Sequence, residues 1–317
     1  MARFILQRLF QTALVLLIMS FVIYNLIGLM PGDPIDVMVA SMPGATPEVV
    51  KHLREIYGLD QPLMLRYWRW LIAALQGDFG FSRTHSRPVL EVLTPALLQT
   101  AKLMLSSFIL SAVLSMILGV TSALKPGGRL DTAVSLFAFA GISVPVFWLA
   151  LVLIMVFAVT LHWFPASGMG TIGASGFFDQ LRYLTLPVVT LTLASTGQFT
   201  RFVRASMIEI LRSDFVRTAW AKGAGDRSVV LIHALRNAMI PVVTVMALSF
   251  GTLFSGALVT ETMFAQWGMG KMIYDSILSN DFNLALTGLL FATLVTLLSN
   301  FVADLAYGWL DPRITLR

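Results

Sequence analysis

Few residues of this sequence are spaced for catalysis or metal binding. The chain has no cysteine, and its four histidines lie far apart, whereas metal sites use Cys and His ligands at short, regular spacings. The stretch around Ser143 lacks the second glycine of a nucleophile elbow, and Gly-Ala-Gly at 223–225 lacks the Lys and Ser or Thr of a phosphate-binding loop. The sequence therefore predicts no enzymatic activity, no metal and no cofactor in this chain.

Polar side chains and prolines inside apolar segments are the residues that could act in transport. In a bilayer a polar group is costly unless it faces other helices or a pathway, and a proline removes a backbone hydrogen bond and kinks a helix. The candidates for a pathway or a helix hinge are Ser143, Pro145, Gln198, Pro241, Thr252, Ser255 and Asn300. For the serines and threonines, hydrogen bonding between neighbouring helices is the favoured alternative.

Asp304 is a carboxylate near one end of the last apolar segment. A proton relay would use such a group, but a position near the membrane surface favours an ion pair with an arginine on the same side. The two halves of the chain, 1–160 and 161–317, also show no convincing internal repeat of the kind found in many secondary transporters. Both observations weaken the hypothesis of a proton-coupled carrier.

The elements that hold these residues are predicted to be transmembrane helices. The chain is 57% hydrophobic and 12% charged, whereas a soluble domain is nearer a quarter charged. Apolar stretches long enough to cross a bilayer occur at about 9–30, 103–124, 132–161, 184–207, 238–260 and 284–309. The first is too long for a signal peptide and is interpreted as an uncleaved span. The sequence thus predicts an all-α integral membrane protein with six transmembrane helices.

The basic residues predict which way these helices run. If the N-terminus is cytoplasmic, 13 of the 22 lysines and arginines lie inside, and most of the others fall in the long first outer segment, which the positive-inside rule discounts. The opposite topology would place the basic stretch 201–236 outside. We therefore expect both termini in the cytoplasm, and the net charge of +5 is interpreted as a topology signal rather than as nucleic-acid binding.

Three regions follow from this topology. Residues 1–30 form the N-terminal tail and first span, 31–96 an external segment, and 97–317 a five-helix transmembrane core with a cytoplasmic loop at about 208–237. Two short interfacial helices are expected in the external segment. The first is capped by Thr46, begins at Pro47 and stops at Gly58, and the second opens at Gln61-Pro62 and ends at Gly77.

The cytoplasmic loop is short and polar, yet it is patterned for a helix. Asp214 can cap this helix, Ala219 and Ala221 allow close approach of another backbone, and Gly223 and Gly225 can end it. Its expected apolar contacts are Phe215, Val216 and Trp220. An ordinary amphipathic connector would show the same pattern, so the residues alone leave that alternative open.

Two runs in this loop resemble a known motif. They are Arg-Thr-Ala-Trp-Ala-Lys-Gly at 217–223 and His-Ala-Leu-Arg-Asn-Ala-Met-Ile-Pro at 233–241, and they resemble the Glu-Ala-Ala loop of binding-protein-dependent ABC importer permeases. Arg217 and Thr218 replace the first two residues of that pattern, as in the dipeptide, oligopeptide and nickel group. Further similarities extend over nearly the whole chain, at 31–34, 57–62, 77–82, 261–264, 268–270 and 310–313. Trp267 stands where the family usually has proline.

The resemblance, closest to the first or B-type permease subunit of this group, implies a type I ABC importer permease fold in the bacterial cytoplasmic (inner) membrane. It implies a second homologous permease, two cytoplasmic ATPases that bind ATP and Mg, and an external binding protein that delivers substrate. It also implies a coupling helix that contacts an ATPase. The coupling residues would be Asp214, Phe215, Arg217, Thr218, Ala219, Ala221, Lys222 and Gly223.

The expected substrate is a di- or oligopeptide. The alternatives that stay open are a permease for nickel or another small solute, a proton-coupled carrier, and a membrane scaffold.

Overall fold

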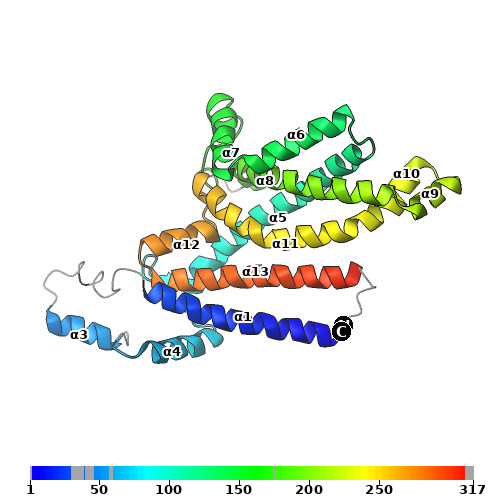
Figure 1. Ribbon diagram of the computed structural model, residues 1–317. Coiled ribbons are helices and arrows are strands. Elements are labelled where there is room, and N and C mark those ends of the chain that lie inside the picture. The colour runs from blue at the N-terminus through cyan, green and yellow to red at the C-terminus, as the bar shows by residue number, and fades with distance from the viewer. Residues whose placement is uncertain (1, 30–38, 40–45, 57–59, 174–175, 311–317) are drawn as a thin grey trace.

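Long helices that lie side by side form most of the structure (Figure 1). The computed structural model describes residues 2–29, 39, 46–56, 60–173 and 176–310. Its long helices are α1 (Ala2–Gly28), α5 (Val89–Ala123), α6 (Arg129–Ser143), α8 (Phe177–Leu211), α11 (Leu235–Met263) and α13 (Phe282–Leu310).

Shorter elements lie at the two ends of this bundle. They are α3 (Pro47–Ile56), α4 (Leu63–Leu75), strands β1 (Phe81–Ser82) and β2 (Arg87–Pro88), α7 (Val146–Leu153), α9 (Asp214–Ala221), α10 (Asp226–Ser228), α12 (Met269–Leu278) and π-helical segments at Ile154–Thr160 and Val229–Ala234. The strands form an antiparallel hairpin with Phe81 opposite Pro88. We call the end that carries α9 and α10 the α9 end, and the end that carries the hairpin and α12 the hairpin end (Figure 1).

Helix α8 is the centre of the packing. It contacts α5, α6 and α11, while α13 packs between α11 and α1. Glycines permit the closest approaches, since a methyl group at Gly197 of α8 would overlap the carbonyl oxygen of Ala138 in α6, and one at Gly119 of α5 would overlap Val203 of α8. Small residues serve this purpose in membrane bundles, where van der Waals contact holds the helices together.

Four described segments are long and apolar enough to cross a membrane. They are 5–28, 89–123, 226–251 and 282–305, and the bent pair formed by α6 and the segment 146–160 would add a fifth. Helix α8 has 35 residues but is more polar. Its threonines at 190, 192, 196 and 200 are buried inside the bundle, which explains how a helix of this composition is accommodated. The count of six spans stays a prediction.

The predicted third span is not one continuous helix. Helix α6 ends at Ser143, α7 begins at Val146, and the two directions differ by 106°. Pro145 has no backbone N–H to donate and forces the preceding residue out of the helical region, so Val144 is extended, with φ −85° and ψ 123°. The segment predicted at 132–161 is therefore divided at Pro145 into two helices, and its role as one span of the membrane stays a prediction.

Helix α5 begins earlier than expected. It starts at Val89 rather than near 103, because Val89, Leu93, Ala96 and Thr100 share one buried face that continues into the span. The remaining span limits agree closely for α11 and α13, and Pro187 and Pro241 lie inside α8 and α11.

Both predicted short helices are present. Pro47 is the first residue of α3, as expected, and the predicted stop at Gly58 lies outside the described residues. Helix α4 ends just before Gly77, whose φ is +86°. It packs on α1, where the hydroxyl groups of Tyr67 and Ser20 are 2.8 Å apart.

Candidate functional site

Helix α9 begins one residue earlier than its predicted cap implies. Ser213 occupies the N-cap position, and Asp214, expected to be the cap, is the first helical residue. The Ser213 hydroxyl donates to the carbonyl oxygen of Ile210, while Asp214 pairs with Arg217 at 3.4 Å. A carboxylate in the first turn still favours the helix, because it lies near the positive end of the helix dipole.

Val216 attaches α9 to the rest of the bundle. Its side chain is completely buried and belongs to one apolar cluster with Val203 and Met207 of α8 and Val229 of the following π-helical segment. Val216 is therefore not the exposed apolar contact that the sequence suggested. Ala219 is half-buried against the same cluster, so it packs inside this chain.

The opposite side of α9 is open. Phe215 is 47% exposed and Trp220 is 38% exposed, so this short polar helix presents two large apolar side chains on its surface. The exposed residues of this side, which we call the α9 surface, are Phe215, Arg217, Thr218, Trp220, Ala221, Lys222 and Gly223. Gly223 has a φ of +86° and turns the chain at the end of the helix, as C-terminal glycines do.

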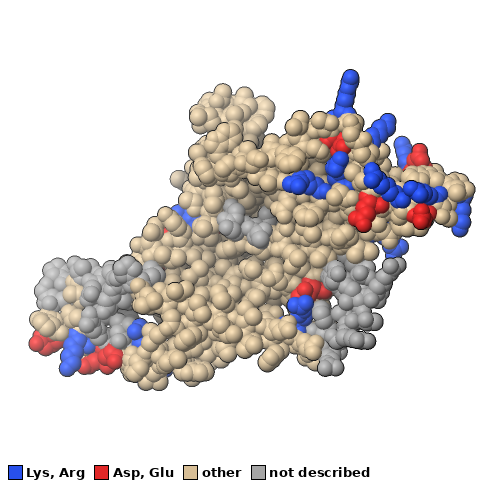
Figure 2. Space-filling view, viewed as in Figure 1, with Lys and Arg blue, Asp and Glu red and all other residues tan. Residues whose placement is uncertain are grey.

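Basic side chains surround the α9 surface. Figure 2 shows lysines and arginines gathered over the α9 end, with a smaller group over α3. Among the residues described there, Arg217 pairs with Asp214, and the Trp220 indole N–H donates to Asp226 at 3.0 Å. The α9 surface thus combines apolar side chains with positive charge.

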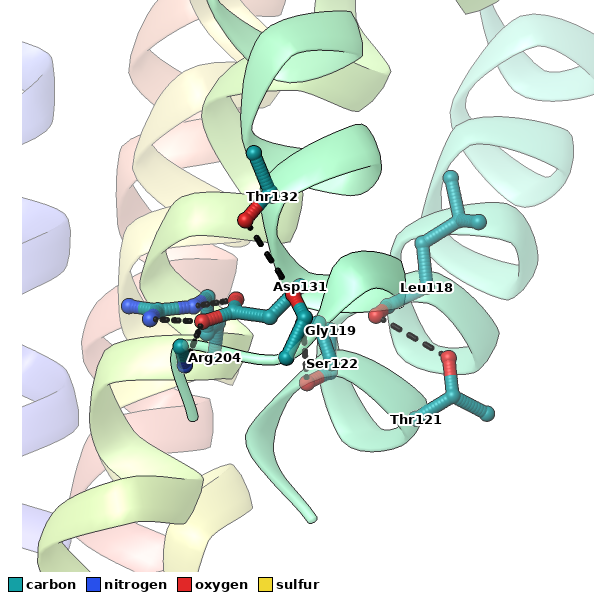
Figure 3. A network of polar contacts seen from close by, with 9 residues as sticks. Leu118, Gly119, Thr121, Ser122, Asp131, Thr132 and Arg204 are labelled. Carbon is teal, nitrogen blue, oxygen red and sulfur yellow. Dashed lines mark hydrogen bonds and ion pairs between the residues drawn. The ribbon is translucent and has the colours of Figure 1, made fainter. Parts of the chain in front are cut away.

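An ion pair between Asp131 and Arg204 joins α6 to α8 close to this end (Figure 3). Arg204 Nη2 donates to Asp131 Oδ2 at 2.7 Å and its Nε to Oδ1 at 2.5 Å, and the backbone N–H of Gly127 donates to Oδ2 at 2.7 Å. Asp131 is only 4% exposed. A buried carboxylate with this many donors ties three segments together.

The sequence reasoning missed this pair. Arg204 was counted only as a topology charge, and Asp131 lies 73 residues away from it. The available signal was a carboxylate in the first turn of an apolar helix, which requires a partner.

The described pathway candidates lie on the surface of the chain and are not brought together. Ser143, Pro145, Gln198, Pro241 and Asn300 are all exposed, and no hydrogen bond joins any two of them among the described residues. The side chains of Thr252 and Ser255 lie outside what the structure describes. Asp304, by contrast, pairs with Arg8 at 3.0 Å, which confirms the expected ion pair.

At the hairpin end, the backbone of residues 268–271 encloses the buried side chain of Glu261. Its carboxylate accepts hydrogen bonds from the Thr100 hydroxyl and, at 3.0 Å, from the N–H of Lys271. The Thr100 hydroxyl also accepts the N–H of Met269 at 2.7 Å. A methyl group at Gly268 would overlap the carboxylate, so glycine is required there. These contacts join α5, α11 and α12.

Asp281 holds the hairpin against the start of α13. Its carboxylate accepts hydrogen bonds from the Ser82 hydroxyl at 2.6 Å and from the Thr84 N–H and hydroxyl at 3.0 and 2.7 Å. Burial disfavours the charged form, but the hydrogen bonds from Ser82 and Thr84 outweigh burial and hold the pKa of Asp281 below its usual value.

Two protein families match this chain. The family described as "Binding-protein-dependent transport system inner membrane component" matches residues 115–316. The family described as "Binding-prot-dependent transport system membrane comp, N-term" matches residues 1–102. Together they cover nearly all of the chain, including α9 and the hairpin.

Similar proteins match over their full length. "Probable peptide ABC transporter permease protein y4tP" of Sinorhizobium fredii is 37% identical over 314 residues, which are 99% of each chain. "Oligopeptide transport system permease protein AppB" of Bacillus subtilis is 34% identical over 316 residues, with the same coverage. "Glutathione transport system permease protein GsiC" of Escherichia coli K12 is 36% identical over 314 residues, again 99% of each chain.

Two solved structures have a similar fold. A chain of the inward-facing MetNI methionine ABC transporter aligns with a TM-score of 0.58 and 19% identity, over 70% of this chain and 97% of that chain. A chain of an amino acid ABC transporter solved with histidines aligns with a TM-score of 0.53 and 12% identity, over 69% and 94%. At these identities the comparison concerns the fold alone.

Proposed function

Because this chain belongs to the family of binding-protein-dependent transport system inner membrane components, we propose that it forms half of the translocation pathway of an ATP-driven importer of di- or oligopeptides. Family membership rests on the match over residues 115–316 and on relatives that are more than 30% identical over 99% of the chain. The chain is accordingly an ABC importer permease of the inner membrane with a type I permease-like helical fold. The expected family and the expected fold are both confirmed.

The substrate class is proposed from the relatives. The names of the relatives described above refer to peptide, oligopeptide and glutathione transport, and glutathione is itself a small peptide. Nothing in the described residues favours nickel as the substrate. A proton-coupled carrier is disfavoured further because Asp304 is paired with Arg8 near one end of α13.

The α9 surface is the observation that carries the coupling proposal. Phe215 and Trp220 are exposed although they are large and apolar, and the basic residues beside them suit an acidic or carbonyl-lined groove. We infer that this surface docks on a cytoplasmic ATPase subunit. Two other coupling candidates have roles within the chain, since Asp214 stabilises the first turn of α9 and Ala219 packs α9 against its own chain.

Motion of α9 would move a large part of the chain. Val216 belongs to the same apolar cluster as Val203 and Met207 of α8, and the Asp131–Arg204 pair fixes α8 to α6. A displacement of the ATPase would therefore be transmitted to α8 and α6 as a rigid body, the kind of movement by which transporters alternate access. The permease itself performs no chemistry, and ATP and Mg bind to the ATPases.

The remaining parts of the proposed importer follow from the orientation. With both termini and α9 in the cytoplasm, the hairpin end faces outward toward an external binding protein. A second homologous permease completes the pathway, and two ATPases drive it. Six spans, with α8 at the centre of the bundle, would place both termini on the cytoplasmic side.

The test is uptake by the reconstituted importer. The permease is combined in liposomes with its second permease, its ATPases and its binding protein, and uptake of radiolabelled dialanine is measured. We expect uptake that requires ATP and the binding protein and continues when a protonophore collapses the proton gradient. Uptake that continues without ATP, or that the protonophore abolishes, would contradict the proposal, and uptake of nickel instead of dialanine would change the substrate class.

A further inference from the structure

An open cavity of about 520 Å³ lies at the hairpin end. It is lined by His85, Arg87, Glu91, Val92, Pro95 and Trp267. These residues come from the hairpin, the first turns of α5 and the connection between α11 and α12. Sites for small molecules usually have volumes of about 300–1,000 Å³, so this cavity is large enough for a peptide of a few residues.

Two opposite charges line the cavity without pairing with each other. Arg87 and Glu91 are both exposed, and among the described residues neither forms an ion pair or a side-chain hydrogen bond. Lys271 and Asp275, which are also four residues apart, do pair, at 2.7 Å. A cation and an anion on one cavity wall suit a ligand that carries both charges.

The rest of the cavity wall is aromatic and apolar. The rings of His85 and Trp267 lie 5.5 Å apart at an angle of 57°. Together with Val92 and Pro95 they offer a surface on which a peptide group or an apolar side chain can lie. A wall of this kind adds contact area without demanding a particular side chain.

The residues that line the cavity are held in place from behind. The hairpin that carries His85 and Arg87 is fixed by the hydrogen bonds of Ser82 and Thr84 to Asp281. The connection that carries Trp267 is fixed by Gln266, which is 1% exposed and accepts a hydrogen bond from Gln99 at 2.7 Å. A preformed wall reduces the ordering cost of binding.

The geometry points to a receiving site for a short peptide with both termini free. Arg87 binds the terminal carboxylate, Glu91 binds the terminal ammonium group, and the peptide lies against Trp267. The inference rests on the proposed function, because it takes peptides as the substrate and the hairpin end as the entrance. It adds that this chain itself holds the substrate as it leaves the binding protein.

The test measures binding to the assembled transporter, purified with its second permease and ATPases but without the binding protein. Dialanine is the probe, and its affinity is measured by calorimetry. We expect Arg87→Gln and Glu91→Gln each to weaken dialanine binding about fivefold, the size of one partly exposed ion pair. Arg69→Gln is the matched control, since Arg69 is an exposed arginine of α4 outside the cavity, and it should bind dialanine normally.

Blocked peptides assign each charge. N-acetyl-dialanine has no ammonium group and should bind equally to the parent chain and to Glu91→Gln. Dialanine amide has no carboxylate and should bind equally to the parent chain and to Arg87→Gln. The inference is overturned if dialanine does not bind without the binding protein, or if it binds both variants as tightly as the parent. It is also overturned if the variants weaken only the association of the binding protein, which would make the cavity a docking surface. ATP-driven dialanine uptake by the parent importer tests the proposed function separately, so the two failures are distinguishable.

Discussion

Three carboxylates, those of Asp131, Glu261 and Asp281, are at most 4% exposed, and each joins segments that lie far apart in the chain. Burying a carboxylate is costly unless several donors bind it. Asp131 receives a guanidinium and a backbone N–H, Glu261 a hydroxyl and backbone N–H groups, and Asp281 two hydroxyls and a backbone N–H. Such residues position helices, and their removal should lower both the stability of the chain and the rate of transport.

Asp131→Asn should destabilise the chain by about 2 kcal/mol. Breaking a fully buried ion pair costs about 3–5 kcal/mol, and less is expected here because the Arg204 side chain is 31% exposed. Asp214→Asn is the matched control, since the pair of Asp214 with Arg217 is exposed. Thermal unfolding in detergent measures both variants, and equal midpoints for the two would contradict the role assigned to Asp131.

Gly268→Ala should be far more harmful than Gly176→Ala. The two glycines have nearly the same φ, −104° and −108°, so alanine is conformationally equivalent at both. At Gly268 the new methyl group would overlap the Glu261 carboxylate, whereas at Gly176 it would meet nothing within 4 Å. Overpacking costs about 1–3 kcal/mol. The amount of folded protein in membranes measures the difference, and similar amounts of the two variants would refute the Glu261 contact.

Acid should weaken the attachment of the hairpin through Asp281. The pKa of Asp281 is lower in the folded chain than in the unfolded chain, so its contribution is complete above the unfolded value of about 3.9 and is lost as the pH falls through the folded pKa. Unfolding measured between about pH 6 and pH 3 should show a steeper loss for the parent chain than for Asp281→Asn. Parallel pH profiles would show that Asp281 is not responsible.

At the scale of elements, α9 has two sides with different tasks, and adjacent residues separate them. Phe215→Ala should leave the fold intact and weaken binding of the ATPase about tenfold, as loss of an interface anchor does. Val216→Ala should instead cost about 2 kcal/mol of stability, because Val216 is completely buried. Pull-down of the ATPase and thermal unfolding distinguish the two effects, and ATPase binding unchanged in Phe215→Ala would argue against the α9 surface as the coupling site.

The limits of a helix could be predicted from the sequence where an apolar run or a cap residue marks them. Continuous apolar runs gave the limits of α11 and α13, and Pro47 gave the start of α3. The break after Ser143 was underestimated, because the sequence alone does not tell whether a proline bends a membrane helix or divides it. The early start of α5 was missed because its first turns are buried by packing rather than marked by a long apolar run.

The candidate site was predicted in part for a similar reason. A cap at Asp214 and a stop at Gly223 predicted a helix between them, and the family resemblance marked that helix for coupling. Which side of α9 faces inward depends on the cluster around Met207 and Val229, which no local pattern reveals. The Asp131–Arg204 pair and the cavity at the hairpin end are assembled from distant segments, so only the fold could bring them together.

At the scale of the whole molecule, one end of the bundle is basic, and the other consists of short elements that Asp281 and Glu261 hold by hydrogen bonds. The α9 surface and a group of basic side chains lie at the first, and the hairpin, α12 and the cavity at the second (Figures 1 and 2). The Arg8–Asp304 pair brings the start of α1 to the end of α13, which fits an even number of crossings between them. Motion is therefore assigned to the α9 end and substrate binding to the hairpin end.

The absence of cysteine allows one direct test of this assignment, because a single introduced thiol is the only reactive site. Thr218→Cys lies on the α9 surface, and Gln180→Cys lies at the exposed start of α8 at the opposite end. A membrane-impermeant maleimide should label Gln180→Cys only from outside and Thr218→Cys only from the cytoplasmic side, and bound ATPase should protect Thr218→Cys. Labelling of Thr218→Cys from outside, or labelling that the ATPase does not change, would contradict the account.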